Sequence, residues 1–210
     1  MIEVLSNYDD ELGDLYLSEE IENIDVHDVD RAVRKAILSG RAVPLLCGSA
    51  LKNKGIQPLL DAVIKYLPDP SAFPAIATNE TTGETDVIIE PLRKGPFRAL
   101  AFKVVNDKDK GLITFFRVYS GLLKSRMKIK NASLNGEIEN IKTLLRVRAD
   151  ETQLLSEIGV GDIGAIVGCK NVRSGDTIVE ESEKDRIVLS GVTMPPPVFF
   201  CSIEAESSRY

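Results

Sequence analysis

The glycines at residues 159–164 are the first feature of the sequence whose spacing could support chemistry. Gly159, Gly161 and Gly164 form the pattern G-x-G-x-x-G. That pattern binds the pyrophosphate of a dinucleotide when it joins a strand to a following helix. The next residues, Ala165–Gly168, are short and typical of a strand. We therefore interpret the glycines as turns beside a strand, and a nucleotide-dependent oxidoreductase remains an alternative that dinucleotide binding would reveal.

A second partial motif occurs at residues 53–56. Asn53-Lys54-Gly55-Ile56 resembles the N-K-x-D sequence with which GTPases read guanine, but Ile56 replaces the aspartate that binds the base. The sequence also lacks the phosphate-binding pattern G-x-x-x-x-G-K-[ST] and any Asp-rich metal site. His27 is the only histidine, which excludes a His-metal cluster and a histidine catalytic dyad. We expect no hydrolysis, metal or bound cofactor in this chain by itself.

The three cysteines predict no disulfide. Cys47, Cys169 and Cys201 lie far apart in apolar runs, so we expect three buried, reduced thiols. No apolar run approaches the roughly 20 residues that span a bilayer, which argues against a membrane partner. The acidic start has neither the basic region of a secretory signal nor the Arg-rich character of a transit peptide.

Charge is unevenly distributed along the chain. The net charge of −6 combines about −10 in residues 1–91, +9 in residues 92–150 and −5 in residues 151–210. A basic block between two acidic ones suggests that a polyanion contacts the middle of the chain, although basic strands are often only solvated surfaces.

The first 67 residues predict helix, strand, loop and helix. Residues 1–40 have helical spacing, with Asp28 as a candidate N-cap and Gly40 as the stop. Ala42–Cys47 predicts an edge strand, and residues 58–67 predict a second helix. We expect the apolar face of that helix to be buried; it comprises Leu59, Leu60, Val63, Ile64 and Leu67. This order is typical of the last unit of an α/β sheet.

Residues 68–96 are rich in proline and read as a partly extended linker. Alternating patterns then predict strands at Phe97–Val105, Leu112–Tyr119, Met127–Asn131, Glu137–Leu144, Asp162–Val167 and Thr177–Val179. Asn135-Gly136 is the strongest hairpin signal among them. Six short strands without a long helix favour a small closed barrel. Pro195–Pro197 marks the next boundary, and residues 198–204 predict a strand of a further domain.

Residues Ala42–Leu67 resemble the last strand and helix of the G domain in the elongation factor G family. Within them, Gly48, Ser49 and Ala50 resemble the fifth GTPase motif, whose backbone N–H groups bind the guanine oxygen. Residues 114–121, 159–163 and 174–177 are similar to turns and strands of that family's domain II.

The resemblance implies an α/β fragment, the tail of a P-loop GTPase domain, followed by an all-β translation-factor-type barrel. The implied boundaries are 1–67 for the end of the G domain with its insert, 68–95 for a linker, 96–192 for domain II and 193–210 for the start of domain III.

Residues 197–204 resemble the mitochondrial type 2 branch of that family. This branch would imply a GTPase that uses GTP and Mg²⁺ as a whole protein and separates ribosomal subunits with ribosome recycling factor in the mitochondrial matrix. The alternatives are an ordinary elongation factor G translocase and, from another class, a stand-alone RNA-binding barrel. DNA is not an implied partner.

The barrel would then dock on small-subunit rRNA. Basic residues of its strands and turns could contact phosphates, which positions a factor without reading sequence. The candidates are Arg117, Lys124, Arg126, Lys128, Lys130, Arg146 and Arg148.

Overall fold

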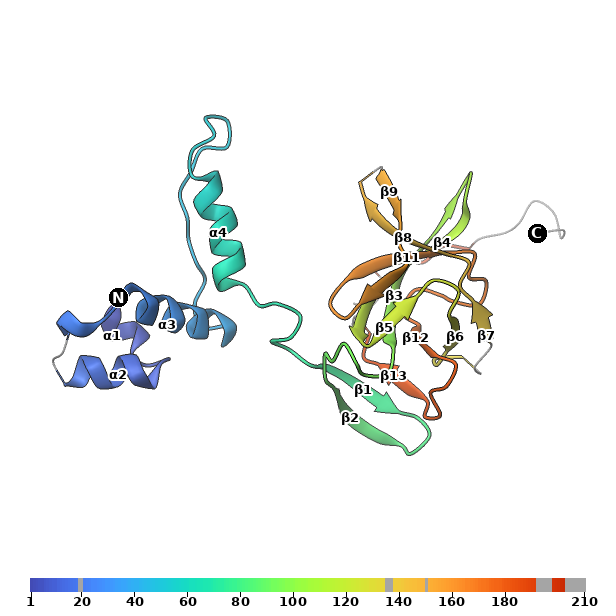
Figure 1. Cartoon of the computed structure of the whole chain (residues 1–210), viewed down its shortest axis with the longest axis horizontal. Coiled ribbons are helices and arrows are strands. Elements are labelled where there is room, and N and C mark those ends of the chain that lie inside the picture. Colours follow the sequence, from blue (N-terminus) through green and yellow to red (C-terminus); the bar gives the residue numbers. More distant parts are fainter. Residues whose placement is uncertain (19–20, 135–137, 150, 192–197, 203–210) are drawn as a thin grey trace. The chain divides into compact units, whose positions relative to one another are not determined.

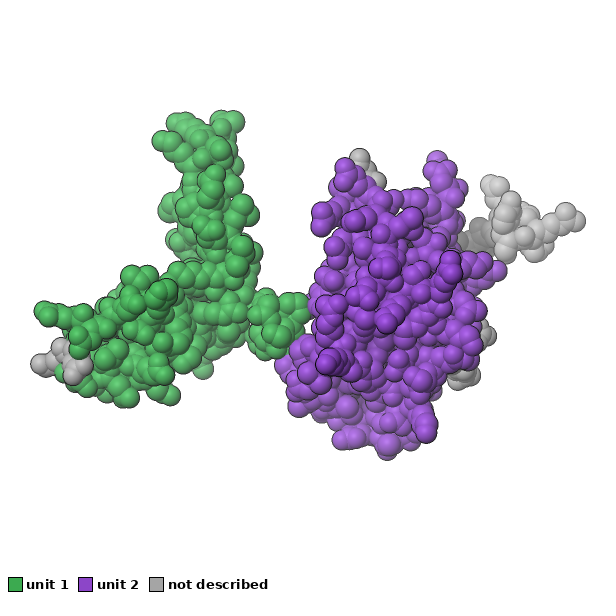
Figure 2. All heavy atoms as spheres, in the orientation of Figure 1, with its two compact units in different colours: residues 1–73 green, residues 74–210 purple. Residues whose placement is uncertain are grey.

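A computed structural model of the chain describes residues 1–18, 21–134, 138–149, 151–191 and 198–202 (Figure 1). Contacts between Cα atoms divide the chain into two compact units, residues 1–73 and residues 74–210 (Figure 2). Each unit has its own arrangement, and the two are considered separately.

The first unit is helical. Its elements are α1 (Ile2–Leu5), α2 (Asp10–Leu17), the 3-10 turn η1 (Ile21–Asn23), α3 (Val26–Leu38) and α4 (Ile56–Tyr66). Leu5 and Leu12 pack with Ala32 and Ala36 of α3 in a small core. The small alanine side chains allow the helices to approach closely at this point.

The start of α3 corrects the predicted N-cap. The cap is Asp25, whose carboxylate accepts from the backbone N–H of Val26 at 2.5 Å. Asp28 is instead the third helical residue, and its carboxylate accepts from the Asp25 N–H at 3.1 Å. The two acids form a reciprocal capping box. Gly40 follows the helix with φ +71°, as expected of a residue that ends it.

A buried carboxylate ties α2 to α3. The side chain of Asp9 is fully buried; it accepts from the Leu12 N–H at 3.0 Å and so caps α2. Its oxygens also lie 3.0 Å from Arg31 Nε and 2.7 Å from Lys35 Nζ. The hydrogen bond from Arg31, with that from Lys35, holds the pKa of Asp9 well below its usual range.

Two predictions for the first unit are wrong in this structure. Residues 42–47 form no strand, because no described segment pairs with them. Val43 and Leu45 are 89% and 93% exposed. The predicted apolar face of α4 is also exposed, from 44% at Leu59 to 81% at Ile64, and only Ala62 is buried. A sheet that could cover both segments is not among the described residues.

The second unit consists of strands. They are β1 (Ala75–Asn79), β2 (Glu84–Ile89), β3 (Arg98–Asp107), β4 (Gly111–Ser120), β5 (Leu122–Lys124), β6 (Lys128–Asn131), β7 (Ile138–Asn140), β8 (Thr143–Arg148), β9 (Glu151–Leu154), β10 (Glu157–Gly159), β11 (Ile163–Val167), β12 (Thr177–Glu180) and β13 (Ile187–Leu189). The largest sheet has the order β7-β6-β12-β3-β4-β11-β8-β9, and β5 pairs with β10.

The large sheet forms the predicted barrel (Figure 1). Strands near both ends of its order contribute side chains to the same core. Phe116 and Val118 alternate along β4 and are fully buried. They share a cluster with Ile129 of β6 and Leu144 of β8, which lie near opposite ends of the sheet order. The sheet must curl for these side chains to meet, so a barrel encloses them.

The linker prediction is wrong for residues 75–89. β1 and β2 form an antiparallel hairpin, and β1 also pairs with β13. Ala77, Ile89 and Leu189 are buried between this small sheet and Leu100 of β3. The alternating residues of this stretch therefore belong to the barrel unit, whereas residues 68–74 stay outside any strand.

The predicted barrel strands are confirmed with shifted limits. The segment predicted as one strand at 137–144 contains β7 and only the start of β8, since Ile141 and Lys142 interrupt the ladder. The sequence did not predict β5, β9, β10 or β13. Asn135-Gly136 lies outside the described residues, as do the last two residues of the strand predicted at 198–204. Residues 198–202 form no regular element, so that prediction is wrong for them.

Candidate functional site

The loop with the GTPase-like motif folds back on itself just before α4. The N–H of Ser49 donates to the carbonyl of Lys54 at 2.9 Å, and the N–H of Lys54 donates back at 3.0 Å. Glycine is required at Gly48 because a β-carbon there would lie 2.8 Å from the Lys54 carbonyl oxygen. Gly55 is the N-cap of α4 and has φ +77°. A β-carbon on Gly55 would come too close to the carbonyl oxygen of Cys47.

The motif residues line a small cavity of about 220 Å³. Its wall comprises Leu46, Cys47, Gly48, Ser49, Ala50, Lys54, Gly55, Ile56 and Leu59. Within the described parts of the chain, the N–H of Ala50 donates to no backbone or side-chain acceptor. An exposed N–H of this kind can donate to a carbonyl oxygen, which fits the oxygen of guanine.

The partial N-K-x-D motif does not complete a binding site for the guanine base. Asn53 has φ +50° within the turn, and Ile56 is the first residue of α4. Its side chain offers no acceptor for the amine of guanine. The loop therefore offers a backbone N–H to one edge of a base.

Only one of the three cysteines is buried as predicted. Cys169 is 2% exposed, and burial beside Glu139 raises its thiol pKa to about 12. Cys47 and Cys201 are exposed. The apolar pattern around Cys47 had implied a covering sheet. Cys47 is exposed because no such sheet is present among the described residues.

Lys124 and Arg126 lie in the segment that leads from β5 into β6. Both residues are exposed, and Arg126 turns the chain with φ +66°. Among the residues that the structure describes, neither forms an ion pair. Glu157 lies opposite Lys124 in the ladder, but its carboxylate pairs with Arg93 at 3.2 Å.

Lys128 and Lys130 share the outer face of β6, because side chains alternate along a strand and Ile129 between them is buried. Lys128 Nζ lies 3.3 Å from Glu181, and Lys130 donates to the main-chain carbonyl of Glu183. The acidic loop after β12 thus partly neutralises this strand. Lys130 keeps its charge uncompensated, since its partner is a carbonyl.

The other three basic candidates lie on β4 and β8. Arg117 stacks over Tyr119, with 5.1 Å from the guanidinium carbon to the ring centroid. Arg146 pairs with Asp162 at 3.4 Å. Arg146 and Arg148 line a cavity of about 240 Å³ with Glu151, Thr152 and Gln153. Four strands separate β6 from β8 in the order of the curled sheet.

Sequence reasoning missed two aromatic residues, Phe102 on β3 and Phe115 on β4. The Phe102 and Phe115 rings have centroids 6.4 Å apart, and Lys103 Nζ lies 5.9 Å from the Phe115 centroid. The ladder shifts register between Ala101 and Lys103. This irregularity places Lys103 opposite Phe115, which an unbroken alternation would not have predicted.

The described residues include no group of three or more His, Cys, Asp or Glu side chains that could hold a metal ion. No helix in the described ranges has the length and apolar character needed to cross a membrane.

Comparison with known proteins identifies the barrel. Residues 111–179 match the family described as elongation factor Tu domain 2. A crystal structure of a protein from Thermus thermophilus has the same fold: the TM-score is 0.65 at 20% identity over 93% of this chain. The chain spans only 26% of that protein. Residues 111–179 of the barrel are therefore similar to elongation factor Tu domain 2, and the chain shares the fold of the Thermus thermophilus protein.

Proposed function

We propose that this chain is part of a GTP-dependent ribosomal factor of the elongation factor G type, whose barrel docks on small-subunit rRNA. The observation that carries the proposal is the basic segment on the surface of a translation-factor barrel. Lys124 and Lys128 are exposed, and Lys130 is half-buried on the same face as Lys128. Phosphates are the partners that such a row of cations attracts.

The finer proposal is a role in mitochondrial ribosome recycling with ribosome recycling factor. It rests on the resemblance of residues 197–204 to the mitochondrial type 2 branch. Among these residues, Phe199 and Phe200 are 78% and 81% exposed. Location in the mitochondrial matrix follows from the same resemblance. An ordinary translocase is the alternative, and subunit splitting by the whole factor together with ribosome recycling factor distinguishes the two.

In the whole factor, GTP hydrolysis with Mg²⁺ would supply the free energy for release from the ribosome. The part of this chain would be limited to the loop at Gly48, Ser49 and Ala50. Its backbone would hold the guanine oxygen, and its double hydrogen bond between Ser49 and Lys54 keeps that backbone in place. No other step of the reaction is assigned to these residues.

Cosedimentation with isolated ribosomal subunits tests the docking proposal. We expect the 210-residue chain to sediment with small subunits at about 50 mM salt and to be released by about 200 mM, since phosphate contacts weaken steeply over that range. Large subunits should retain much less of it. Equal retention by both subunits, or none by small subunits at low salt, would contradict the proposal.

A further inference from the structure

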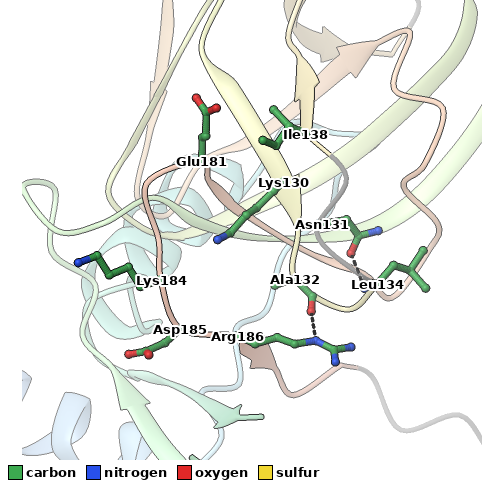
Figure 3. Close-up of a pocket in the computed structure, with 9 residues that line it drawn as sticks. All are labelled: Lys130, Asn131, Ala132, Leu134, Ile138, Glu181, Lys184, Asp185 and Arg186. Atoms are coloured by element: carbon green, nitrogen blue, oxygen red, sulfur yellow. Dashed lines mark hydrogen bonds between the residues drawn. The ribbon is translucent and has the colours of Figure 1, made fainter. Parts of the chain in front are cut away.

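A cavity of the barrel unit lies between the β6–β7 hairpin and the loop that follows β12. Its volume is about 440 Å³, within the roughly 300–1,000 Å³ range in which proteins bind small organic ligands. Figure 3 shows the lining residues, which are Lys130, Asn131, Ala132, Leu134, Ile138, Glu181, Lys184, Asp185 and Arg186. None of them belongs to the loop at residues 48–50.

Arg186 holds together the two walls of the cavity, which are the β6–β7 hairpin and the loop after β12. Its Nε donates to the Ala132 carbonyl at 2.8 Å (Figure 3). One terminal nitrogen donates to the Ser133 carbonyl at 2.9 Å. The same guanidinium lies 2.9 Å from a carboxylate oxygen of Glu80, and the Arg186 backbone N–H donates to Thr81. Three segments of the chain therefore meet at one side chain, so the cavity is already formed without a ligand.

The hairpin wall of the cavity is apolar. Ile138 and Leu134 are 53% and 40% exposed, and Ala132 lines the cavity with them. Ile138 is the ladder partner of Lys130, so both side chains leave the same face of the hairpin. A planar, partly apolar ligand can lie against Ile138 and Leu134 while its charged end reaches the lysine.

Two lysines of the cavity, Lys130 and Lys184, remain available to bind an anion. Glu181 is already paired with Lys128, and Arg186 with Glu80. Lys130 donates one N–H to a carbonyl, which leaves two donors on its ammonium group. Lys184 forms no ion pair with any described residue. Asp185 is likewise unpaired within the described ranges and can accept from an amine.

We propose that this cavity binds one unstacked nucleotide. The base would lie against Leu134 and Ile138, and its phosphate would contact Lys130 and Lys184. A nucleotide combines a planar base with an anion, which matches this pairing of an apolar wall with two lysines. The inference rests on the proposed docking on rRNA, because Lys130 belongs to the same basic segment. It adds that one base leaves its stack to enter the barrel.

Binding of two RNA hairpins by the full 210-residue chain tests the proposal. One hairpin carries a single-nucleotide adenosine bulge, and the other has an abasic sugar at the same position. Both offer the same phosphates, so their affinities differ only if the base is bound. We expect the bulged hairpin to bind about three- to tenfold more tightly, as loss of about 1 kcal/mol of base contact implies.

Two variants locate the contact. Ile138→Ser should make the two affinities equal, whereas Ile88→Ser, at a similarly exposed isoleucine on β2, should leave the difference unchanged. Lys130→Ser with Lys184→Ser should weaken both hairpins. Circular dichroism checks folding. Equal affinities for the two hairpins in the unchanged chain, or an unchanged difference in Ile138→Ser, would overturn the proposal.

A competition experiment distinguishes binding of a free nucleotide from binding of a nucleotide within RNA. Adenosine monophosphate that displaces the bulged hairpin at millimolar concentration indicates that a free nucleotide also fits, while displacement only by RNA indicates that neighbouring phosphates are required. Retention of the chain by small subunits is measured in parallel. If retention persists while the hairpins bind equally, the cavity proposal fails and the docking proposal stands; if retention is absent, the docking proposal fails.

Discussion

Gly121 and Phe97 are in backbone contact. A β-carbon on Gly121 would lie 2.7 Å from both the Cα and the backbone nitrogen of Phe97, and also 2.7 Å from the carbonyl oxygen of Gly95. Gly121 has φ +76°, and its N–H donates to the Leu92 carbonyl at 2.9 Å. This contact brings the residues before β3 against the end of β4, where Phe97 joins the barrel core.

Replacing Gly121 should therefore cost more than strain in φ alone. Gly111 is a matched control, because its φ is +75° and nothing lies within 4 Å of a β-carbon there. We expect Gly111→Ala to destabilise the barrel by about 1 kcal/mol from left-handed strain. Gly121→Ala should cost about 3 kcal/mol because the backbone must also move. Urea unfolding measures both, and equal losses would show that the contact with Phe97 is unimportant.

The stability of the helical unit should depend on pH through Asp9. Its pKa is lower in the folded chain than in the unfolded chain, where an aspartate titrates near about 4. The ion pairs with Arg31 and Lys35 therefore contribute fully above that pH, and their contribution is lost as the pH falls through the folded-state pKa. Urea unfolding followed by helical circular dichroism at pH 7 and pH 3 measures the change.

Asp9→Asn should lower stability at pH 7 by about 1–3 kcal/mol, since it removes a charge-assisted partner from a buried site. It should also reduce the loss of helical stability between pH 7 and pH 3. Asp10→Asn is the control, because Asp10 is exposed at the start of α2. The assignment is wrong if both variants behave like the unchanged chain.

Thiol labelling should distinguish the three cysteines. Cys47 and Cys201 are exposed, whereas Cys169 is buried and its pKa is about 12. At pH 8 the Cys169 thiolate is scarce as well as inaccessible. We expect Ellman's reagent to titrate two thiols rapidly in the folded chain and the third only after denaturation. Three rapid thiols in the folded chain would contradict the packing of Cys169.

The chain alone should not bind GTP appreciably. The loop at Gly48, Ser49 and Ala50 offers contacts to one edge of guanine, while the phosphate-binding lysine and the N-K-x-D aspartate are missing from the sequence. These groups supply most of the binding energy of a nucleotide in GTPases. Isothermal calorimetry should therefore detect no micromolar affinity. A dissociation constant in the micromolar range would require a phosphate site that this account lacks.

The barrel could be predicted because its pattern is local. Alternation along Phe116 and Val118, and turn residues such as Gly121, describe contacts that these strands make within the chain. The face of α4 was predicted to be buried for a similar reason, yet Ile64 is 81% exposed. Periodicity shows that a side chain prefers burial, and it does not show whether the covering element is present.

The cavity beside β6 could not be predicted, because its walls come from distant parts of the sequence. Arg186 joins Ala132 to Glu80, although both lie far from it along the chain. Nothing in the local pattern around Arg186 marks it as a bridge. Similarly, the pairing of Lys128 with Glu181 depends on the register between β6 and β12. The basic block was visible in the sequence, but its partial neutralisation was not.

The salt dependence of small-subunit binding tests the central claim most directly. Lys124, Arg126, Lys128 and Lys130 are changed together to serine, and the control variant carries serine at Lys94, Lys142, Lys170 and Arg173. We expect the first variant to bind more weakly and to lose somewhat under one unit of salt slope for each phosphate contact removed. The control, with the same change in net charge, should keep most of the slope. Equal affinities and slopes for the two variants, with both folded by circular dichroism, would contradict docking through this segment.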